Sequence, residues 1–150
     1  MKKIFIMFLF LVSSCGYKPI YSNQNINNLT FSKIEFNGDN LINRKLKNLL
    51  PFKEKKNIDS VYEVLIVSKY NSIIASKNSK GEINSYTSSL NIDLSILKNG
   101  TSDMKNFSQN FTYNTISNNY DLKEYQNIIK NELINKIAED IILFLNFYDS

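Results

Sequence analysis

The fold is decided by residues 82–97, which read EINSYTSSLNIDLSIL. Apolar and polar side chains alternate along this stretch, and that period is typical of a β-strand with one buried and one open face. One face carries the large side chains of Tyr86, Leu90, Ile92, Leu94 and Ile96, and the other carries Thr87, Ser89, Asn91, Asp93 and Ser95. The sequence therefore predicts a strand from Glu82 to Leu97 in a sheet that has one apolar and one polar face.

Turn signals on both sides of this stretch predict two neighbouring strands. Asn78-Ser79-Lys80-Gly81 connects it, as a hairpin, to a strand from about Ser60 to Ser76. In that strand Val61, Leu65 and Val67 put apolar groups on both faces. On the other side, Asn99-Gly100 marks a tight turn that leads to a strand from Phe107 to Ile116.

Two helices are expected to flank these three strands. A first strand from Leu29 to Phe36 is followed by Asp39, which we expect to cap a helix from Asn40 to Leu50. At the other end, Asp121 and Glu124 have the spacing of a capping box. A stripe of apolar residues then continues at helical spacing, through Leu122, Tyr125, Ile129, Leu133, Ile137, Ile141, Phe144 and Tyr148.

This order of elements predicts an α+β fold of β-α-β-β-β-α type. A half-buried sheet needs a cover, so we expect a two-layer sandwich in which both helices lie on one face of a four-stranded mixed sheet. The first crossover should be right-handed and parallel, and the remaining connections antiparallel. The opposite sheet face is then left bare, and its hydroxyl and amide groups can both donate and accept hydrogen bonds.

The N-terminus has the layout of a cleaved export signal. Lys2 and Lys3 precede an apolar run from Ile4 to Val12, and two small residues then precede Cys15, the single cysteine of the chain. This pattern resembles the bacterial lipobox, so we expect a signal peptide over 1–14 and a lipid on Cys15. The alternatives are an ordinary secretory signal with an incidental cysteine, or a short uncleaved anchor.

The mature chain is then expected to divide into two parts. Residues 15–28 predict a lipidated N-terminus and tether, although Tyr17, Ile20 and Tyr21 are large residues that could pack back on the domain. Residues 29–150 predict a single α+β domain, close to the commonest domain size. Gly16 stands where an aspartate would signal inner-membrane retention in many bacteria, which favours a lipid anchor in the periplasmic leaflet of the outer membrane.

Composition argues against several classes of function. The formal charge falls from +4 to +2 once Lys2 and Lys3 leave with the signal, too little to favour nucleic acid. The chain has no histidine, and the thiol of Cys15 is expected to be blocked, so the usual general base and nucleophile are missing. Carboxylates that could pair as in a glycosidase are found at Glu63, Glu82, Asp93 and Asp103. We expect a protein that is not an enzyme and has no metal or cofactor besides the covalent lipid.

The start of the mature chain also carries a family resemblance. Cys15, Gly16, Tyr17, Pro19, Ile20 and Tyr21, with Lys18 at the free position, match Cys-Gly, an aromatic, any residue, Pro, an aliphatic and Tyr. Together with the strand and helix order, this resembles the lipopolysaccharide-assembly lipoprotein family LptE, particularly its alphaproteobacterial branch. The motif covers seven residues, and the element order extends the likeness across the mature chain.

The resemblance implies a partner and a ligand. Members of this family plug the lumen of the outer-membrane β-barrel LptD, and the pair inserts lipopolysaccharide into the outer leaflet. Under this hypothesis, Ser89, Asn91 and Thr112 are candidates to face the barrel, because the lumen of such a barrel is polar. Lys69, Lys77 and Lys80 are candidates to contact the phosphates of lipopolysaccharide. The alternative is a free periplasm-facing lipoprotein, either a transporter auxiliary or a small hydrolase.

Overall fold

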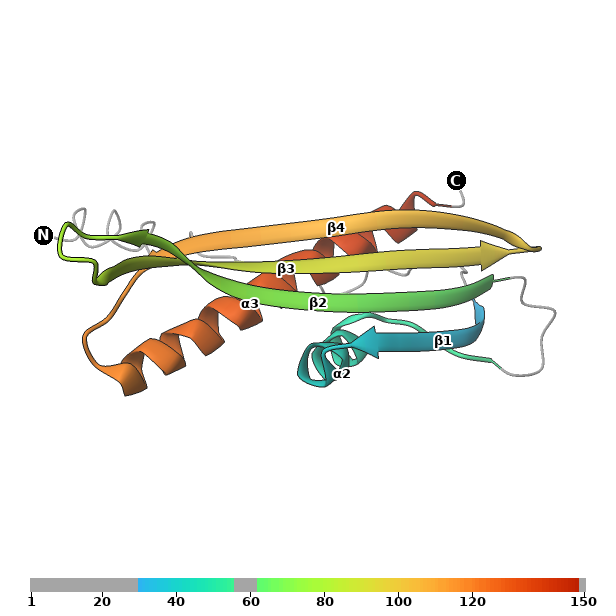
Figure 1. Ribbon diagram of the computed structural model, residues 1–150. Coiled ribbons are helices and arrows are strands. Elements are labelled where there is room, and N and C mark those ends of the chain that lie inside the picture. Colours follow the sequence, from blue (N-terminus) through green and yellow to red (C-terminus); the bar gives the residue numbers. More distant parts are fainter. Residues whose placement is uncertain (1–29, 56–61, 149–150) are drawn as a thin grey trace, which may run out of the picture.

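The computed structural model describes residues 30–55 and 62–148, which form one four-stranded sheet and two helices (Figure 1). The element order is β1, α2, β2, β3, β4 and α3, so the predicted β-α-β-β-β-α arrangement is confirmed. The signal peptide expected over 1–14 and the tether expected over 15–28 lie outside the described residues. Cys15, Gly16, Tyr17, Pro19 and Tyr21 lie there with them.

The sheet is mixed and its strands follow chain order. β1 (Phe31–Gly38) pairs in parallel with β2 (Tyr62–Lys77), β2 pairs antiparallel with β3 (Ile83–Lys98), and β3 pairs antiparallel with β4 (Thr101–Asn114). β1 ends opposite Ser68, and the second half of β2 continues beyond it as the edge of the sheet (Figure 1). β2, β3 and β4 therefore extend beyond the end of β1 as a three-stranded sheet.

Several strand boundaries differ from the sequence prediction; β4, for instance, ends at Asn114, two residues before the expected Ile116. β4 begins at Thr101, six residues before the expected Phe107, because Asn99 and Gly100 adopt positive φ angles of 50° and 82° and turn the chain directly back onto β3. Residues 101–106 lack apolar alternation, and pairing with β3 makes them a strand. β1 also continues through Gly38, two residues beyond the expected Phe36.

α2 (Asn40–Leu49) begins where predicted. The Asp39 carboxylate accepts hydrogen bonds from the backbone N–H groups of Leu41 and Ile42, as an N-cap does. Buried Ser68 on β2 fixes this junction, because its hydroxyl donates to the Asn43 side chain at 2.7 Å and accepts from the Asp39 N–H at 3.0 Å. The crossover from β1 into α2 is thus held by the neighbouring strand.

α3 (Asn119–Asn146) starts earlier than the sequence indicates. Its N-cap is Asn118, whose side chain accepts from the Tyr120 N–H at 2.9 Å, and Asp121 lies inside the first turn. The prediction that Asp121 caps this helix is therefore wrong: Asn118 is also a good capping residue and lies one turn earlier. No helix among the described residues is both long and apolar enough to span a membrane.

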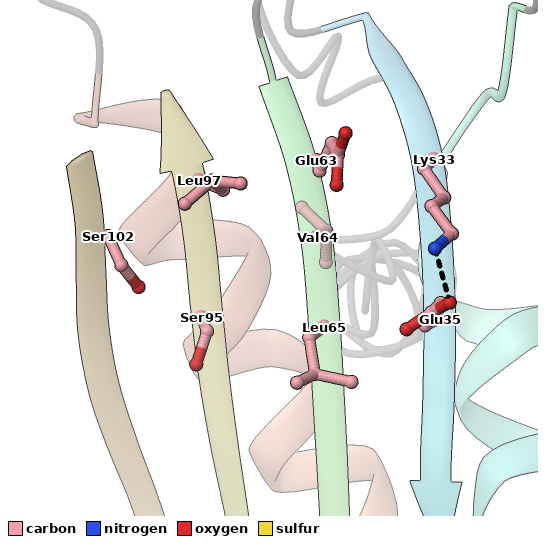
Figure 2. A pocket seen from close by; sticks show the side chains of 8 residues that line it. All are labelled: Lys33, Glu35, Glu63, Val64, Leu65, Ser95, Leu97 and Ser102. Carbon is pink, nitrogen blue, oxygen red and sulfur yellow. Dashed lines mark ion pairs between the residues drawn. The ribbon is translucent and has the colours of Figure 1, made fainter. Parts of the chain in front are cut away.

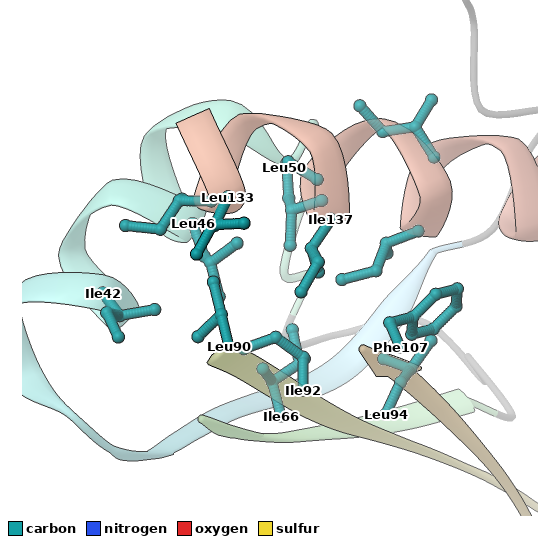
Figure 3. Close-up of a cluster of buried hydrophobic side chains, with 14 of the residues drawn as sticks. Ile42, Leu46, Leu50, Ile66, Leu90, Ile92, Leu94, Phe107, Leu133 and Ile137 are labelled. Carbon is teal, nitrogen blue, oxygen red and sulfur yellow. The ribbon is translucent and has the colours of Figure 1, made fainter. Parts of the chain in front are cut away.

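Both helices pack on the same face of the sheet and enclose the core (Figure 3). Ile92 of β3, Ile66 of β2, Ile42 of α2 and Ile137 of α3 are all fully buried in this layer. In α3 the buried side chains begin at Ile129, so its first turns contribute little to the core. The core consequently lies under the middle and the β1 end of the sheet.

Candidate functional site

The face of the sheet opposite the helices is open, and the strand register determines what it presents. Even-numbered residues of β2 and β3, such as Ile66 and Ile92, point to the core, so their odd-numbered neighbours point to the open face. From the β1 end to the hairpin tip, the cross-strand rows on this face are Lys33-Glu63-Leu97-Ser102, Glu35-Leu65-Ser95-Met104, Asn37-Val67-Asp93-Asn106, Lys69-Asn91-Ser108, Asn71-Ser89-Asn110 and Ile73-Thr87-Thr112.

The three rows toward the hairpin tip form a polar field. We use this name for Asn71, Thr87, Ser89, Asn91, Ser108, Asn110 and Thr112. Ser89 and Asn91 are half-buried between their neighbours, and Thr112 is exposed. The Thr112 hydroxyl lies 2.7 Å from that of Thr87 in the adjacent strand. The three residues predicted to face a barrel therefore share one surface of small, uncharged groups on β3 and β4, and Lys69 and Ile73 of β2 lie at its edge.

The two rows at the β1 end have a different character. Leu65, Leu97 and Met104 bring apolar side chains to the open face, where Leu97 is 38% and Met104 76% exposed. With Lys33 and the carboxylates of this end, Leu65 and Leu97 line a shallow depression of about 220 Å³ (Figure 2). The expectation of a uniformly polar open face is therefore wrong at this end, because β2 is apolar on both sides there. We call this surface the apolar depression.

One edge of the depression carries an ion pair. The Lys33 ammonium lies 2.6 Å from the Glu35 carboxylate, and both side chains are about half exposed. The hydrogen bond to Glu35 and the charge of that carboxylate raise the pKa of Lys33 above its ordinary value. Glu63 lines the same depression, so its edge carries two carboxylates and one ammonium group (Figure 2).

The candidate lysines for lipopolysaccharide contact are not gathered in one place. Lys69 lies midway along β2 on the open face, Lys77 is the last residue of β2, and Lys80 is in the turn at the hairpin tip. Eight residues of strand separate Lys69 from Lys77, about 26 Å at the rise of a β-strand. A single phosphate group could therefore not contact all three lysines.

A cluster of hydroxyl groups on the helix-covered face was not anticipated from the sequence. Ser88 is fully buried, and its Oγ lies 2.9 Å from the Tyr70 hydroxyl and 3.3 Å from those of Ser72 and Tyr113. Its sequence signal was a small polar residue at an even, core-facing position of β3, two residues before Leu90. Since each hydroxyl has a hydrogen-bond partner, the cluster serves packing of the sheet against α3.

The acidic residues considered as a glycosidase pair are dispersed. Glu82 lies at the hairpin tip, and Asp93 and Asp103 lie on opposite faces of the sheet. Glu63 is four residues of strand from the row of Asp93, about 13 Å. Among residues 30–55 and 62–148, no group of three His, Cys, Asp or Glu side chains could hold a metal ion.

Similarity to known proteins lies in the fold. No family model matches the chain, and no curated protein matches it in sequence. It is similar to the rare lipoprotein B of Shewanella oneidensis, with a TM-score of 0.56 and 12% identity; the match covers 74% of this chain and 90% of that chain. A lipoprotein B from Nitrosomonas europaea, itself uncharacterised, gives a TM-score of 0.63 and 10% identity, covering 87% of this chain and 92% of that chain. The chain therefore shares its fold with these two bacterial lipoproteins.

Proposed function

We propose that this protein is an outer-membrane lipoprotein, anchored by a lipid on Cys15, that acts as the plug and assembly partner of an LptD-type β-barrel in lipopolysaccharide transport. One observation carries the proposal: a helix-covered face seals the core, while on the opposite face the polar field runs through three successive rows of β3 and β4, with Lys69 and Ile73 at its β2 edge. The LptE-like start of the mature chain, and a fold shared with bacterial lipoproteins, support the same function.

The chemistry of the polar field suits an enclosed polar partner. A hydroxyl or amide that is buried without a hydrogen-bond partner costs about 1 to 3 kcal/mol, so an interface inside a polar lumen favours small groups that donate and accept. Ser89, Asn91 and Thr112 are such groups. A charged side chain at these positions would have to be desolvated against the barrel, and we expect it to weaken the complex.

The proposed protein is not an enzyme, and its ligand is the transported glycolipid. Lys77 and Lys80 at the hairpin tip are the basic residues that a lipid A phosphate could contact together, and Lys69 offers a separate contact further along β2. Lysine provides a point charge to a phosphate group, without the bidentate geometry of arginine. Replacing Lys77 and Lys80 together by alanine should therefore weaken glycolipid binding more than replacing Lys69 alone.

Co-purification tests the proposed partner. The tagged lipoprotein, extracted in detergent, should bring down a much larger barrel protein and resist dissociation from it. Ser89→Lys, Asn91→Lys or Thr112→Lys should reduce the amount of barrel recovered, and Asn127→Lys, at an exposed position of α3, should not. A monomer without a barrel partner would instead favour the free periplasm-facing lipoprotein. Unchanged recovery with all three polar-field variants would show that another surface binds the barrel.

A further inference from the structure

The apolar depression exposes more apolar side chain than its polar surroundings explain. Leu65, Leu97 and Met104 lie in two adjacent rows at the end of the open face where β1 starts. The helices cover only the other face, so Leu97 and Met104 are exposed to solvent and Leu65 is half-buried. An exposed apolar patch with a charged edge is a common signature of a docking surface.

The chain itself carries a segment suited to this surface. Tyr17, Ile20 and Tyr21 lie a few residues before Thr30, in a stretch that otherwise consists largely of polar residues. The same stretch carries Lys18, and the edge of the depression carries the carboxylates of Glu35 and Glu63. Because Lys33 already pairs with Glu35, this edge keeps one net negative charge, which Lys18 can complement beside the apolar floor.

The topology places this segment within reach of the depression. The chain enters the sheet at Phe31, opposite Tyr62, and Tyr62 pairs with Lys98, the neighbour of Leu97. Leu97 is two strand spacings from β1, about 10 Å across the sheet. Nine residues separate Tyr21 from Thr30 and can span about 30 Å at most. The chain between Tyr21 and Thr30 is therefore long enough for residues 17–21 to reach Leu97.

We propose that residues 17–21 dock on the apolar depression and cover Leu65 and Leu97, with Lys18 beside Glu35 and Glu63. A second hollow near β1, lined by Ile34, Phe36 and Phe52, is a weaker candidate. The Lys47 ammonium already lies over the Phe36 ring at 5.0 Å, and the Phe52 ring packs on Phe31 at 5.1 Å. This inference concerns the chain alone and does not depend on a barrel partner.

Disulfide trapping tests the position of the segment. In the mature lipoprotein, Tyr21→Cys combined with Leu97→Cys should form an intramolecular disulfide under mild oxidation, detected by mass and by gel mobility before and after reduction. Tyr21→Cys combined with Ile73→Cys is the matched control on the same face. Ile73 lies eleven residues along β2 from Tyr62, the partner of Phe31 at the start of β1; this is about 36 Å, which is beyond the reach of residue 21. A disulfide between chains would overturn the proposal in favour of a second copy as the occupant.

Fluorescence gives an independent readout, because the chain contains no tryptophan. Tyr21→Trp should emit at shorter wavelength than the same variant in denaturant and resist quenching by acrylamide. Adding Leu97→Lys should increase quenching at least twofold, whereas adding Ile73→Lys should leave it unchanged. Equal quenching in both double variants, together with no 21–97 disulfide, would overturn the proposal. Intact mass reports the lipid on Cys15 separately, so a failure of the proposed function would be distinguishable.

Discussion

Gly38 provides the sharpest test of how the first crossover is built. It is the last residue of β1, has a φ of +99°, and immediately precedes Asp39, the N-cap of α2. A Cβ atom at this position would lie 2.0 Å from the backbone oxygen of Ser68 and 2.9 Å from its carbonyl carbon. Both contacts are with backbone of the neighbouring strand, so no side-chain rotation can relieve them.

The expected cost of Gly38→Ala has two parts. A left-handed backbone costs an L-residue about 1 to 2 kcal/mol. Relieving the contact at 2.0 Å also requires β1 and β2 to separate by more than 1 Å, which disturbs the Asp39 N–H to Ser68 hydrogen bond of 3.0 Å. Loss of that bond adds about 1 to 3 kcal/mol. We therefore expect a total loss of about 3 kcal/mol and a fall in Tm of about 10 °C for a domain of this size.

A matched variant separates the two parts. Gly81→Ala in the hairpin turn meets a similar φ of +83°, but no atom lies within 4 Å of the added Cβ. It should lose only the backbone contribution, about 1 to 2 kcal/mol. Urea denaturation and thermal melting followed by circular dichroism would measure both variants. If Gly38→Ala proved no more destabilising than Gly81→Ala, the close approach of β1 to Ser68 would be refuted.

Three further predictions concern the core, the helix cap and pH. Ile92→Asp or Ile137→Asp places an unpaired charge in the fully buried layer and should unfold the domain at 25 °C, seen as loss of the cooperative melting transition. Asp39→Ala removes the cap of α2 and should lower the free energy of unfolding by about 1 kcal/mol in urea titrations. Burial and the 2.5 Å hydrogen bond to Asp103 raise the pKa of Tyr148 from 10.0 to about 12. Because the folded pKa exceeds the ordinary one, the stabilisation is fully present below pH 10 and is lost as pH rises toward 12. The stability difference between the wild type and Tyr148→Phe should therefore be constant from pH 7 to 9 and shrink between pH 10 and 12.

Much of the fold could be predicted because its local signals agree. The alternation from Tyr86 to Ile96 fixed which side of β3 is buried, and Asp39 identified the start of α2. The predicted start of α3 was wrong because Asn118 and Asp121 are both acceptable caps, and only the path of the chain after β4 selects between them. Residues 101–106 have no strand period of their own, and their pairing with β3 is a tertiary contact.

The residues of the candidate site could be predicted only where the alternation within a single strand shows which face of the sheet they occupy. Alternation within β3 placed Ser89 and Asn91 on the open face, and alternation within β4 placed Thr112 there too. The apolar depression depends on rows that cross all four strands, from Glu35 to Met104, and a single-strand pattern does not contain them. The separation of Lys69 from Lys80 likewise follows from the length of the hairpin that β2 and β3 form.

Periodicity and turn residues were enough to set the element types, the sidedness of β3 and β4, and the export-signal pattern at the N-terminus, since these depend on neighbours a few residues apart. The strand register, the early start of β4, the hydroxyl cluster around Ser88 and the apolar depression were decided only in three dimensions. The early start of β4 requires the pairing of residues 101–106 with residues 93–98, and the other features require contacts between residues further apart in the chain. Their free energy depends on the packing of whole strands and helices against one another, which no local stretch of sequence specifies by itself.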